Sequence, residues 1–321
     1  MNKFFQAVQE YRNSKRINKS VIHGEFSKAV WLVGDARSGT TWISSLLNAD
    51  KSYREMFEPF HPQKVSQAKQ FVENMYVAPK TRNDELMLFL KKVFDGSLTN
   101  SWVDKELVSK SYKGLLIKDV FANLILGWAT HEFPNVKPIL LVRNPLSVAA
   151  SKYVTRRWNW PNSPRQFLED KNLMSTHLSG LRETILDVTK RDDFIEKQVL
   201  NWCVIHKVIS SQFSLNDIHI LCYEKVIENP KAEIENALRY CGKIQNTELT
   251  QETLSESSIV AFKGSSIIEK KDPLTIWRET ISKEQIALSI SLLKSFEFDN
   301  WYENLITPDV SNIYSSFKKK E

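Results

Sequence analysis

The stretch LVGDARSGTTWISSLL, residues 32–47, constrains the fold of this chain more than any other feature. An apolar run ends at a glycine-containing turn, and a helical pattern begins directly after the turn. This arrangement points the free backbone N–H groups of the helix, and its partial positive charge, at one spot. The sequence therefore predicts a strand, a loop and a helix that together bind an anion.

The loop differs from the common phosphate-binding pattern in the position of its cation. Gly34 and Gly39 have the usual spacing, but Thr40 stands where that pattern has lysine, and the cation is Arg37, three residues earlier. In the common pattern the lysine reaches the β- and γ-phosphates and a hydroxyl holds magnesium. The missing lysine argues against an ordinary nucleoside triphosphate site.

Short apolar runs elsewhere alternate with helical patterns. Runs at 28–34, 114–120, 137–145 and 217–223 read as buried strands, and helices are predicted over 82–94 and 229–242. This order predicts an α/β fold with a central parallel sheet flanked by helices. We expect one domain over residues 1–321, in which the charge-rich stretches 156–193 and 243–275 are lids or insertions.

Composition excludes several classes of protein. The 321 residues are 42% apolar, as in a globular protein, and the net charge of +6 is spread without a basic run dense enough for nucleic acid. The three cysteines are far apart and lack metal-ligand spacing, so neither a disulfide framework nor a metal site is expected.

The N-terminal 27 residues predict an amphipathic helix. Phe4, Phe5, Val8 and Tyr11 have helical spacing, and basic residues follow. Such a helix can lie on a membrane, but docking on its own domain is commoner, and we expect docking. No apolar run has the pattern of a signal peptide or the length of a membrane span, so a cytoplasmic location is expected, with the oligomeric state open.

A second cation lies at the end of a predicted strand. Nucleotide triphosphatases place an acidic magnesium ligand at the end of a neighbouring strand, but the run PILLVRNP ends in Arg143. A cation there suits a further phosphate and repels a metal. The sequence therefore predicts a metal-free, polyanionic ligand that is bound at two separated anionic ends.

Four motifs in order along the chain carry a family resemblance. RSGTTW at 37–42 resembles the phosphosulfate loop of sulfotransferases that use 3′-phosphoadenosine 5′-phosphosulfate (PAPS), and RNPLSVAASKY at 143–153 resembles their 3′-phosphate motif. CYEKVIENP at 222–230 is similar to their Tyr-Glu segment. FKGSS at 262–266, followed by WRETISKEQ, is similar to their Lys-Gly loop. The resemblance implies a P-loop-NTPase-like sulfotransferase fold.

The resemblance also implies roles in binding the donor. Arg37 and the loop would hold the 5′-phosphosulfate and stabilise charge on the bridging oxygen, and Trp42 would stack on adenine. The loop residues in this role are Ser38, Gly39, Thr40 and Thr41. The residues implied at the 3′-phosphate are Arg143, Ser151, Lys263 and Gly264, and Tyr223 would contact the base. Packing in the core is an alternative for Trp42 and Tyr223.

The catalytic base is where the sequence departs from the cytosolic animal type. Those enzymes have lysine in place of Arg37 and a Lys-Thr-His segment, whereas here IKDVF keeps Lys118 without a histidine. We expect Lys118, like Arg37, to be catalytic and to act mainly on the sulfuryl group. Carbohydrate-type and many bacterial relatives have arginine in the loop and a Glu-Pro segment, which MFEPFHP at 56–62 resembles. Glu58 is therefore the first candidate base, followed by His61 and Asp119, with a salt-bridged structural role as the alternative for Glu58.

The resemblance implies transfer of a sulfuryl group from PAPS to an acceptor hydroxyl, releasing adenosine 3′,5′-bisphosphate (PAP). A carbohydrate acceptor is favoured, because the loop and Glu58 are of the carbohydrate type and TRRWNWPNSPR at 155–165 suits sugar faces and anionic groups. A lipid, a small alcohol or a protein side chain stays open. A P-loop kinase or NTPase, distinguishable by assays with EDTA, and a non-catalytic nucleotide-binding protein are the remoter alternatives.

Overall fold

Five parallel strands form the central sheet of the computed structural model, which describes residues 29–109, 111–155, 163–243 and 272–317. The strands lie side by side in the order β2-β3-β1-β4-β5. Their bounds are β1 Ala29–Gly34, β2 Tyr53–Phe57, β3 Gly114–Asp119, β4 Val136–Val142 and β5 His219–Cys222. The predicted α/β class with a parallel sheet is confirmed, and β2 ends directly before Glu58.

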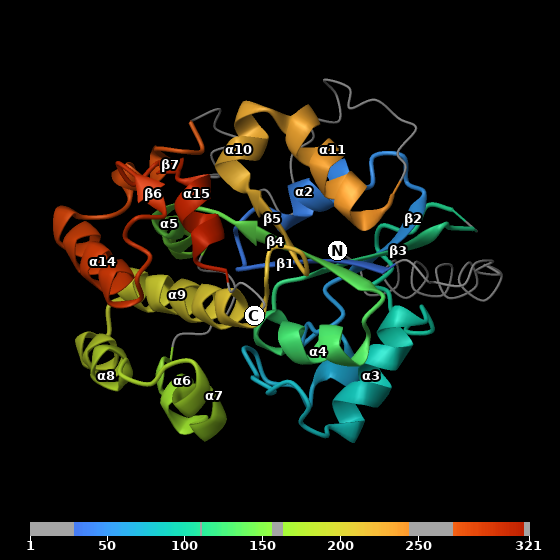
Figure 1. Ribbon diagram of the computed structural model, residues 1–321, viewed down its shortest axis with the longest axis horizontal. Coiled ribbons are helices and arrows are strands. Elements are labelled where there is room, and N and C mark those ends of the chain that lie inside the picture. Colours follow the sequence, from blue (N-terminus) through green and yellow to red (C-terminus); the bar gives the residue numbers. More distant parts are fainter. Residues whose placement is uncertain (1–28, 110, 156–162, 244–271, 318–321) are drawn as a thin grey trace, which may run out of the picture.

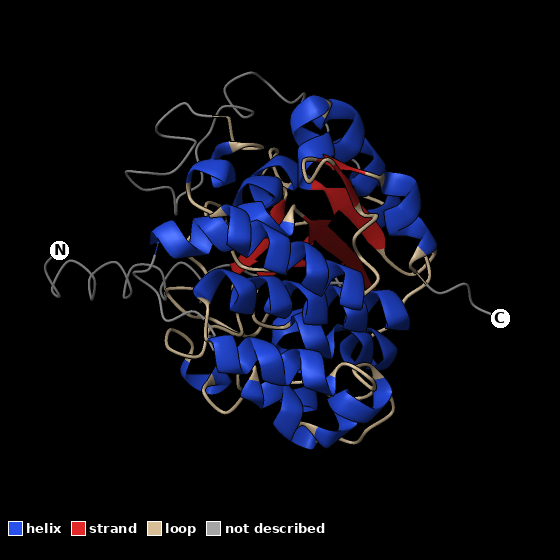
Figure 2. Cartoon of the chain, turned by 90° about the vertical axis from the view of Figure 1, so that its left-hand side faces the viewer, coloured by secondary structure: helices blue, strands red, loops and turns tan. Residues whose placement is uncertain are grey.

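Helices cover both faces of this sheet (Figure 1 and Figure 2). Before β5 they are α2 Thr40–Leu47, α3 Asp84–Phe94, α4 Leu126–Glu132, α5 Pro145–Thr155, α6 Arg165–Glu169, α7 Lys171–Thr176, α8 Arg182–Arg191 and α9 Phe194–Gln212. After β5 they are α10 Tyr223–Glu228, α11 Pro230–Cys241, α14 Lys283–Ser295 and α15 Val310–Ser315. A short antiparallel pair, β6 Tyr302–Glu303 and β7 Thr307–Pro308, precedes α15.

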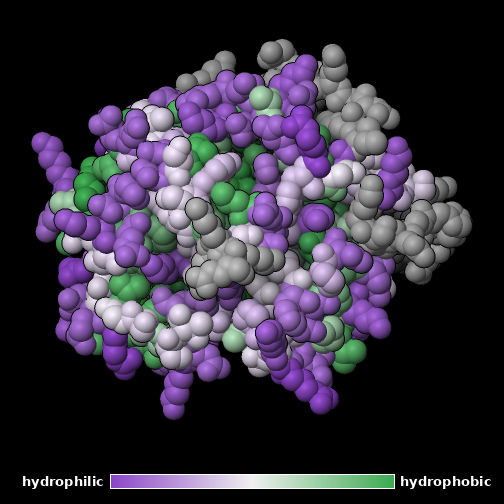
Figure 3. Space-filling view, viewed as in Figure 1, coloured by the Kyte–Doolittle hydropathy of each residue, from purple (hydrophilic) through white to green (hydrophobic). Residues whose placement is uncertain are grey.

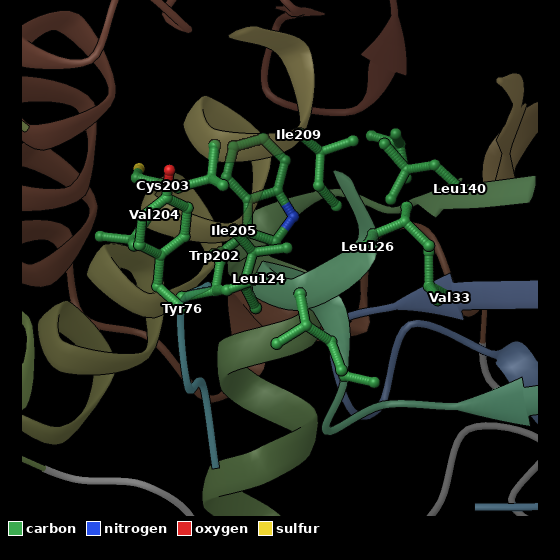
Figure 4. Close-up of a cluster of buried hydrophobic side chains, with 14 of the residues drawn as sticks. Val33, Tyr76, Leu124, Leu126, Leu140, Trp202, Cys203, Val204, Ile205 and Ile209 are labelled. Carbon is green, nitrogen blue, oxygen red and sulfur yellow. The ribbon is translucent and has the colours of Figure 1, made fainter. Parts of the chain in front are cut away.

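Alternate residues of each strand point to opposite faces of the sheet, which divides the core into two layers. From β1, Val30 and Leu32 pack with α2 and α11, while Trp31 and Val33 pack in the larger layer with α3, α4, α5 and α9. In that larger layer Trp202 and Ile205 of α9 lie beside Leu124 (Figure 4). Strands buried on both faces explain the continuous apolar runs of the sequence.

The two helices predicted over 82–94 and 229–242 form as α3 and α11. The α3 helix begins after Asn83, whose side chain accepts a hydrogen bond from the Leu86 N–H. The α11 helix begins with Pro230 after an asparagine cap and ends at Gly242, which has a φ of 63°. A left-handed backbone at the end of a helix favours glycine. The residues at both ends of α11 are therefore those expected of a helix start and a helix stop.

The predicted insertions are described only in part. Within 156–193 the structure describes 163–193, where α6, α7 and α8 form a small layer that contacts α9 through α8. Most of 243–275 and all of 1–27 lie outside the described residues, so the predicted lids and the N-terminal helix stay predictions. On the face seen in Figure 3, hydrophilic side chains predominate and hydrophobic ones form small separate groups.

Candidate active site

The glycine loop joins β1 to α2 and has the backbone shape of an anion-binding turn. Arg37 and Gly39 both have left-handed backbones, with φ values of 72° and 102°. Gly39 precedes α2, and no side chain caps the helix. The Ser38 hydroxyl is buried and has no hydrogen-bond partner among the described residues. Uncapped N–H groups and an unpaired hydroxyl suit an anion at this turn.

Two glycines are required here by close packing. A Cβ added to Gly39 would lie 2.6 Å from Cε2 of Tyr223, and one added to Gly34 would lie 2.8 Å from the Leu141 carbonyl oxygen. Real Cβ atoms do not approach other atoms that closely. The glycine spacing noted in the sequence therefore reflects contact with β4 and α10 as well as the turn itself.

The loop is anchored by a buried ion pair. Lys152 of α5 donates a hydrogen bond of 2.6 Å to Oδ1 of Asp35, and the two side chains are 2% and 6% exposed. The Asp35 carbonyl accepts a bond from the Ser38 N–H, which closes the turn. Burial raises the pKa of Asp35, and attraction to Lys152 offsets part of that rise. The pair fixes the start of the loop against the helix that carries Ser151.

Arg143 follows β4 and is held from several sides. Its guanidinium lies 4.1 Å from the centre of the Tyr223 ring, and its two Nη atoms donate to the carbonyls of Arg37 and Pro273, each at 3.2 Å. Trp202 donates to the Arg143 carbonyl. The buried Nε has no partner among the described residues. A fixed guanidinium with a spare donor fits a phosphate.

The predicted binding residues at both ends of the ligand lie together. Nε of Arg37 donates a hydrogen bond of 3.1 Å to the hydroxyl of Ser151, eight residues after Arg143. Trp42 is half-buried and meets the Tyr223 ring edge-on, with 5.6 Å between the ring centres. The fold therefore brings Arg37, Arg143, Ser151 and the two aromatic rings to one end of the sheet.

The first candidate base forms an ion pair with the predicted strand-end lysine. Oε1 of Glu58 lies 2.5 Å from Nζ of Lys118, and the side chains are 12% and 2% exposed. The Glu58 N–H also donates to the Lys118 carbonyl at 2.7 Å. Glu58 has a left-handed φ of 46°, which directs the chain away from β2 after the strand. Strain of this kind is frequent at functional sites.

The other two candidate bases differ in surroundings. Both carboxylate oxygens of Asp119 accept backbone N–H groups, from Phe60 and Phe121, and burial raises its pKa to about 7. Asp119 therefore holds the turn after β2. His61 is half-buried against Trp102 and Phe121, and burial lowers its pKa, so a neutral ring is favoured near neutral pH.

Some predicted binding residues lie outside the described residues. They are Lys263, Gly264 and the aromatic and basic residues of 156–162, so their parts in the site stay predictions. Among the described residues no group of three or more His, Cys, Asp or Glu is arranged to hold a metal ion. None of the helices in the described ranges is long and apolar enough to cross a membrane.

Three supporting residues were not foreseen from the sequence. Besides the Asp35 and Lys152 pair, Oε1 of Glu224 accepts the N–H of Asn144 at 2.8 Å, and burial raises the pKa of Glu224 to about 7. Each contact joins residues 80 or more positions apart. No local pattern marks such a pair. Asp35 and Glu224 lie within two residues of a strand end, which is a weak signal, and Lys152 has no such signal.

This arrangement defines a class of protein. A parallel sheet with an anion-binding loop after its central strand, and cations at the end of the adjoining strand, is a nucleotide-binding fold with its ligand at the carboxyl edge. A family model described as "Sulfotransferase domain" matches residues 27–287. The chain belongs to the PAPS-dependent sulfotransferase family, and the kinase, NTPase and non-catalytic alternatives are set aside.

Several solved structures are similar to the chain. A sulfotransferase from Alicyclobacillus acidocaldarius is 11% identical, with 83% of this chain and 95% of that chain covered and a TM-score of 0.38. Mouse SULT7A1 in complex with PAP is 12% identical, with 89% and 90% covered and a TM-score of 0.42. Retinol dehydratase with retinol and PAP is 15% identical, with 90% and 86% covered and a TM-score of 0.43. No curated protein sequence matches the chain. With identities and scores this low, no residue role is taken from these proteins.

Proposed function

We propose that this enzyme transfers the sulfuryl group of PAPS to a hydroxyl of a carbohydrate acceptor, with Glu58 as the general base. One observation carries the proposal: the carboxyl edge of the sheet bears the Glu58 and Lys118 pair on β2 and β3, the loop on β1 and Arg143 on β4, in that spatial order. Neighbouring strands are about 5 Å apart, so Lys118 is next to the loop. Donor and acceptor would meet between β1 and β3.

The donor's parts match the described residues by charge. The 3′-phosphate would pair with Arg143 and Ser151, using the spare Nε donor, and the 5′-phosphosulfate would meet the N–H groups after Ser38. The half-buried Trp42 ring would offer a flat surface for adenine, whereas Tyr223 is 5% exposed and packs in the core against Arg143. PAPS supplies a sulfuryl group on a phosphate leaving group, and Arg37 would stabilise the charge that develops on the bridging oxygen.

The proposed transfer balances without a metal. The acceptor oxygen attacks sulfur in line as Glu58 takes its proton; the new S–O bond forms while the bond to the bridging oxygen breaks, and the electron pair stays with the phosphate of PAP. Lys118 holds the Glu58 carboxylate before the reaction. Once Glu58 is protonated, the Lys118 ammonium is available to the sulfuryl oxygens. The carbohydrate acceptor is favoured by Arg37 in the loop together with the Glu58-Pro59 segment.

Arg143→Ala is expected to weaken PAP binding by tens of fold. A charge-assisted hydrogen bond to a phosphate contributes about 1.5 to 3 kcal/mol, and this guanidinium is held in place before the ligand arrives. Isothermal titration calorimetry with PAP measures the loss. Arg82→Ala, which removes an arginine that is 86% exposed, is the matched control. Equal PAP affinity in Arg143→Ala and the wild type would remove Arg143 from the site.

Arg37→Ala is expected to lower kcat more than it weakens PAP binding. The side chain is proposed to act on charge that develops only in the transition state, and such contacts affect kcat rather than ground-state affinity. Because Arg37 also donates to Ser151, a modest loss of PAP affinity is expected as well. Initial rates with radiolabelled PAPS and PAP titrations separate the two effects. A loss confined to PAP affinity would assign Arg37 to the 3′-phosphate alone.

A further inference from the structure

A segment after α3 lies against the edge strand beside the proposed base. The N–H of Phe57, the last residue of β2, donates a hydrogen bond of 2.9 Å to the Val103 carbonyl. This contact places Trp102 and Lys105 next to Phe57, and Glu58 is the following residue. The two rings of Trp102 and Phe57 meet edge-on, with 5.3 Å between their centres. The segment is thus part of the wall around the Glu58 and Lys118 pair.

Two ammonium groups contact one aromatic ring at this wall. Nζ of Lys105 lies 3.0 Å from the centre of the Phe57 ring and 4.7 Å from that of Trp102, and Nζ of Lys118 lies 4.1 Å from the centre of the Phe57 ring. Lys118 has Glu58 as its partner. Lys105 forms no ion pair with any carboxylate of the described residues. The direct contacts of this half-buried ammonium are therefore aromatic faces, and Glu58, Glu106 and Glu55 act on it only from beyond ion-pair distance.

A third lysine adds to the excess of positive charge. Nζ of the exposed Lys64 lies 5.7 Å from the centre of the same Trp102 ring. Of the three ammonium groups around Trp102 and Phe57, Lys118 is paired directly with a carboxylate, Glu58, while Glu106 and Glu55 act on Lys105 without forming an ion pair with it. Contact with an aromatic face stabilises a cation only modestly and does not replace a counter-ion for a group that has lost part of its water.

The lowered pKa of Lys105 agrees with the lack of a directly paired carboxylate. Burial, followed by repulsion from Lys118, lowers the pKa of Lys105 to about 8. The carboxylates that act on it in the opposite direction are Glu58, Glu106 and Glu55. A purely structural lysine on an aromatic ring would be better placed with its ammonium in water. The ammonium is instead held where it loses hydration, beside the residue proposed to activate the acceptor.

We propose that Lys105, supported by Lys64, binds an anionic group of the acceptor, so that the acceptor is a hydroxyl compound that already carries a carboxylate, phosphate or sulfate. This inference rests on the proposed function, because it takes the acceptor hydroxyl to lie at Glu58. The anionic group would supply the counter-ion that Lys105 lacks. Charge on the acceptor would then position the hydroxyl as well as select the substrate.

Binding of matched probe pairs to the PAP-saturated enzyme tests this inference. The pairs are p-nitrophenyl β-D-glucuronide with p-nitrophenyl β-D-glucoside, and glucose 6-phosphate with glucose, measured by calorimetry or ligand-observed NMR at pH 7. At least one anionic member is expected to bind about tenfold or more tightly than its neutral partner. Lys105→Met should remove most of that preference and leave PAP affinity unchanged. Lys91→Met, which changes an exposed lysine on α3, is the control.

The pH dependence of the preference for the anionic probe is a second measurement that tests the inference. Lys105 binds an anion only when protonated, so the preference should be full below its pKa of about 8 and should fade as the pH rises through that value. The glucuronide pair is used for this series, because its carboxylate stays ionised over the whole range, whereas a phosphate monoester has a second pKa of about 6. The preference of Lys105→Met should show no such step.

Three results would overturn the inference. They are the absence of a preference for either anionic probe, a preference that survives Lys105→Met, and a loss of PAP affinity in Lys105→Met, which would place Lys105 at the donor instead. Failure of PAP to bind the wild type is a separate result that would contradict the proposed function itself. The two failures are therefore distinguishable in the same set of titrations.

Discussion

Glu58→Gln is expected to bind PAP with wild-type affinity and to lose nearly all sulfuryl transfer. An alcohol is a poor nucleophile at neutral pH, and a positioned base contributes about a hundred- to ten-thousand-fold to the rate. Glutamine has the size of glutamate, and its amide oxygen still accepts a hydrogen bond from Lys118. The turn after β2 should therefore stay in place while the proton acceptor is lost. Single-turnover rates and PAP titrations measure the two properties.

A nearby carboxylate provides the control for this variant. Glu106→Gln removes one negative charge from the same wall without touching Lys118, so a general electrostatic effect would appear in both variants. His61→Ala should lose less activity than Glu58→Gln, through lost packing against Trp102 and Phe121. Near wild-type kcat in Glu58→Gln, combined with abolished transfer in His61→Ala, would make the histidine the base.

The sheet and the donor end of the site could be predicted because their signals are local. A buried strand is a run of apolar residues, and an anion-binding turn is a short pattern of glycine, hydroxyl and cation. The local sequence of residues 29–42 is therefore enough to predict the strand and the turn. The eight-residue spacing of Arg143 and Ser151 is also a local signal, because Arg143 directly follows β4 and Ser151 lies in the next helix, α5. Each of these features depends on neighbours in the chain.

The acceptor side could not be predicted in the same way. Lys105 has no pattern around it in the sequence, and its place beside Phe57 follows from the hydrogen bond between Phe57 and Val103 across 46 positions. The arginines and tryptophans of residues 155–165 predict acceptor recognition there instead, and the structure does not describe most of these residues. Glu58 was found only because a family resemblance singled out the Glu-Pro segment. A salt bridge at Glu58 was the alternative to its role as base, and the structure shows such a bridge, but Lys118 was not foreseen as the partner.

Loss of the buried pair of Asp35 and Lys152 should destabilise the fold strongly. Lys152→Met keeps the length of the side chain but removes the cation that pairs with the Asp35 side chain, which is 6% exposed. Breaking a buried pair in this way typically costs about 3 to 5 kcal/mol, because the remaining charge stays buried. Urea unfolding followed by circular dichroism should show a loss in the free energy of unfolding of that size. The surface control Lys190→Met, whose ion pair is exposed, should lie within about 0.5 kcal/mol of the wild type.

The pH dependence of the stability loss in Lys152→Met tests whether the unpaired Asp35 carboxylate causes that loss. Burial raises the pKa of Asp35 above its value in the unfolded chain, and removing Lys152 removes an interaction that opposes this rise. A raised folded-state pKa contributes stability below the unfolded value and loses it as the pH rises through the folded value. The deficit of Lys152→Met should therefore shrink as the pH falls toward 4, and adding Asp35→Asn should recover part of it at pH 7. A deficit that is equal at pH 4.5 and pH 7.5, and unchanged in the double variant, would mean that lost packing of the Lys152 stem, rather than the buried charge, destabilises the loop.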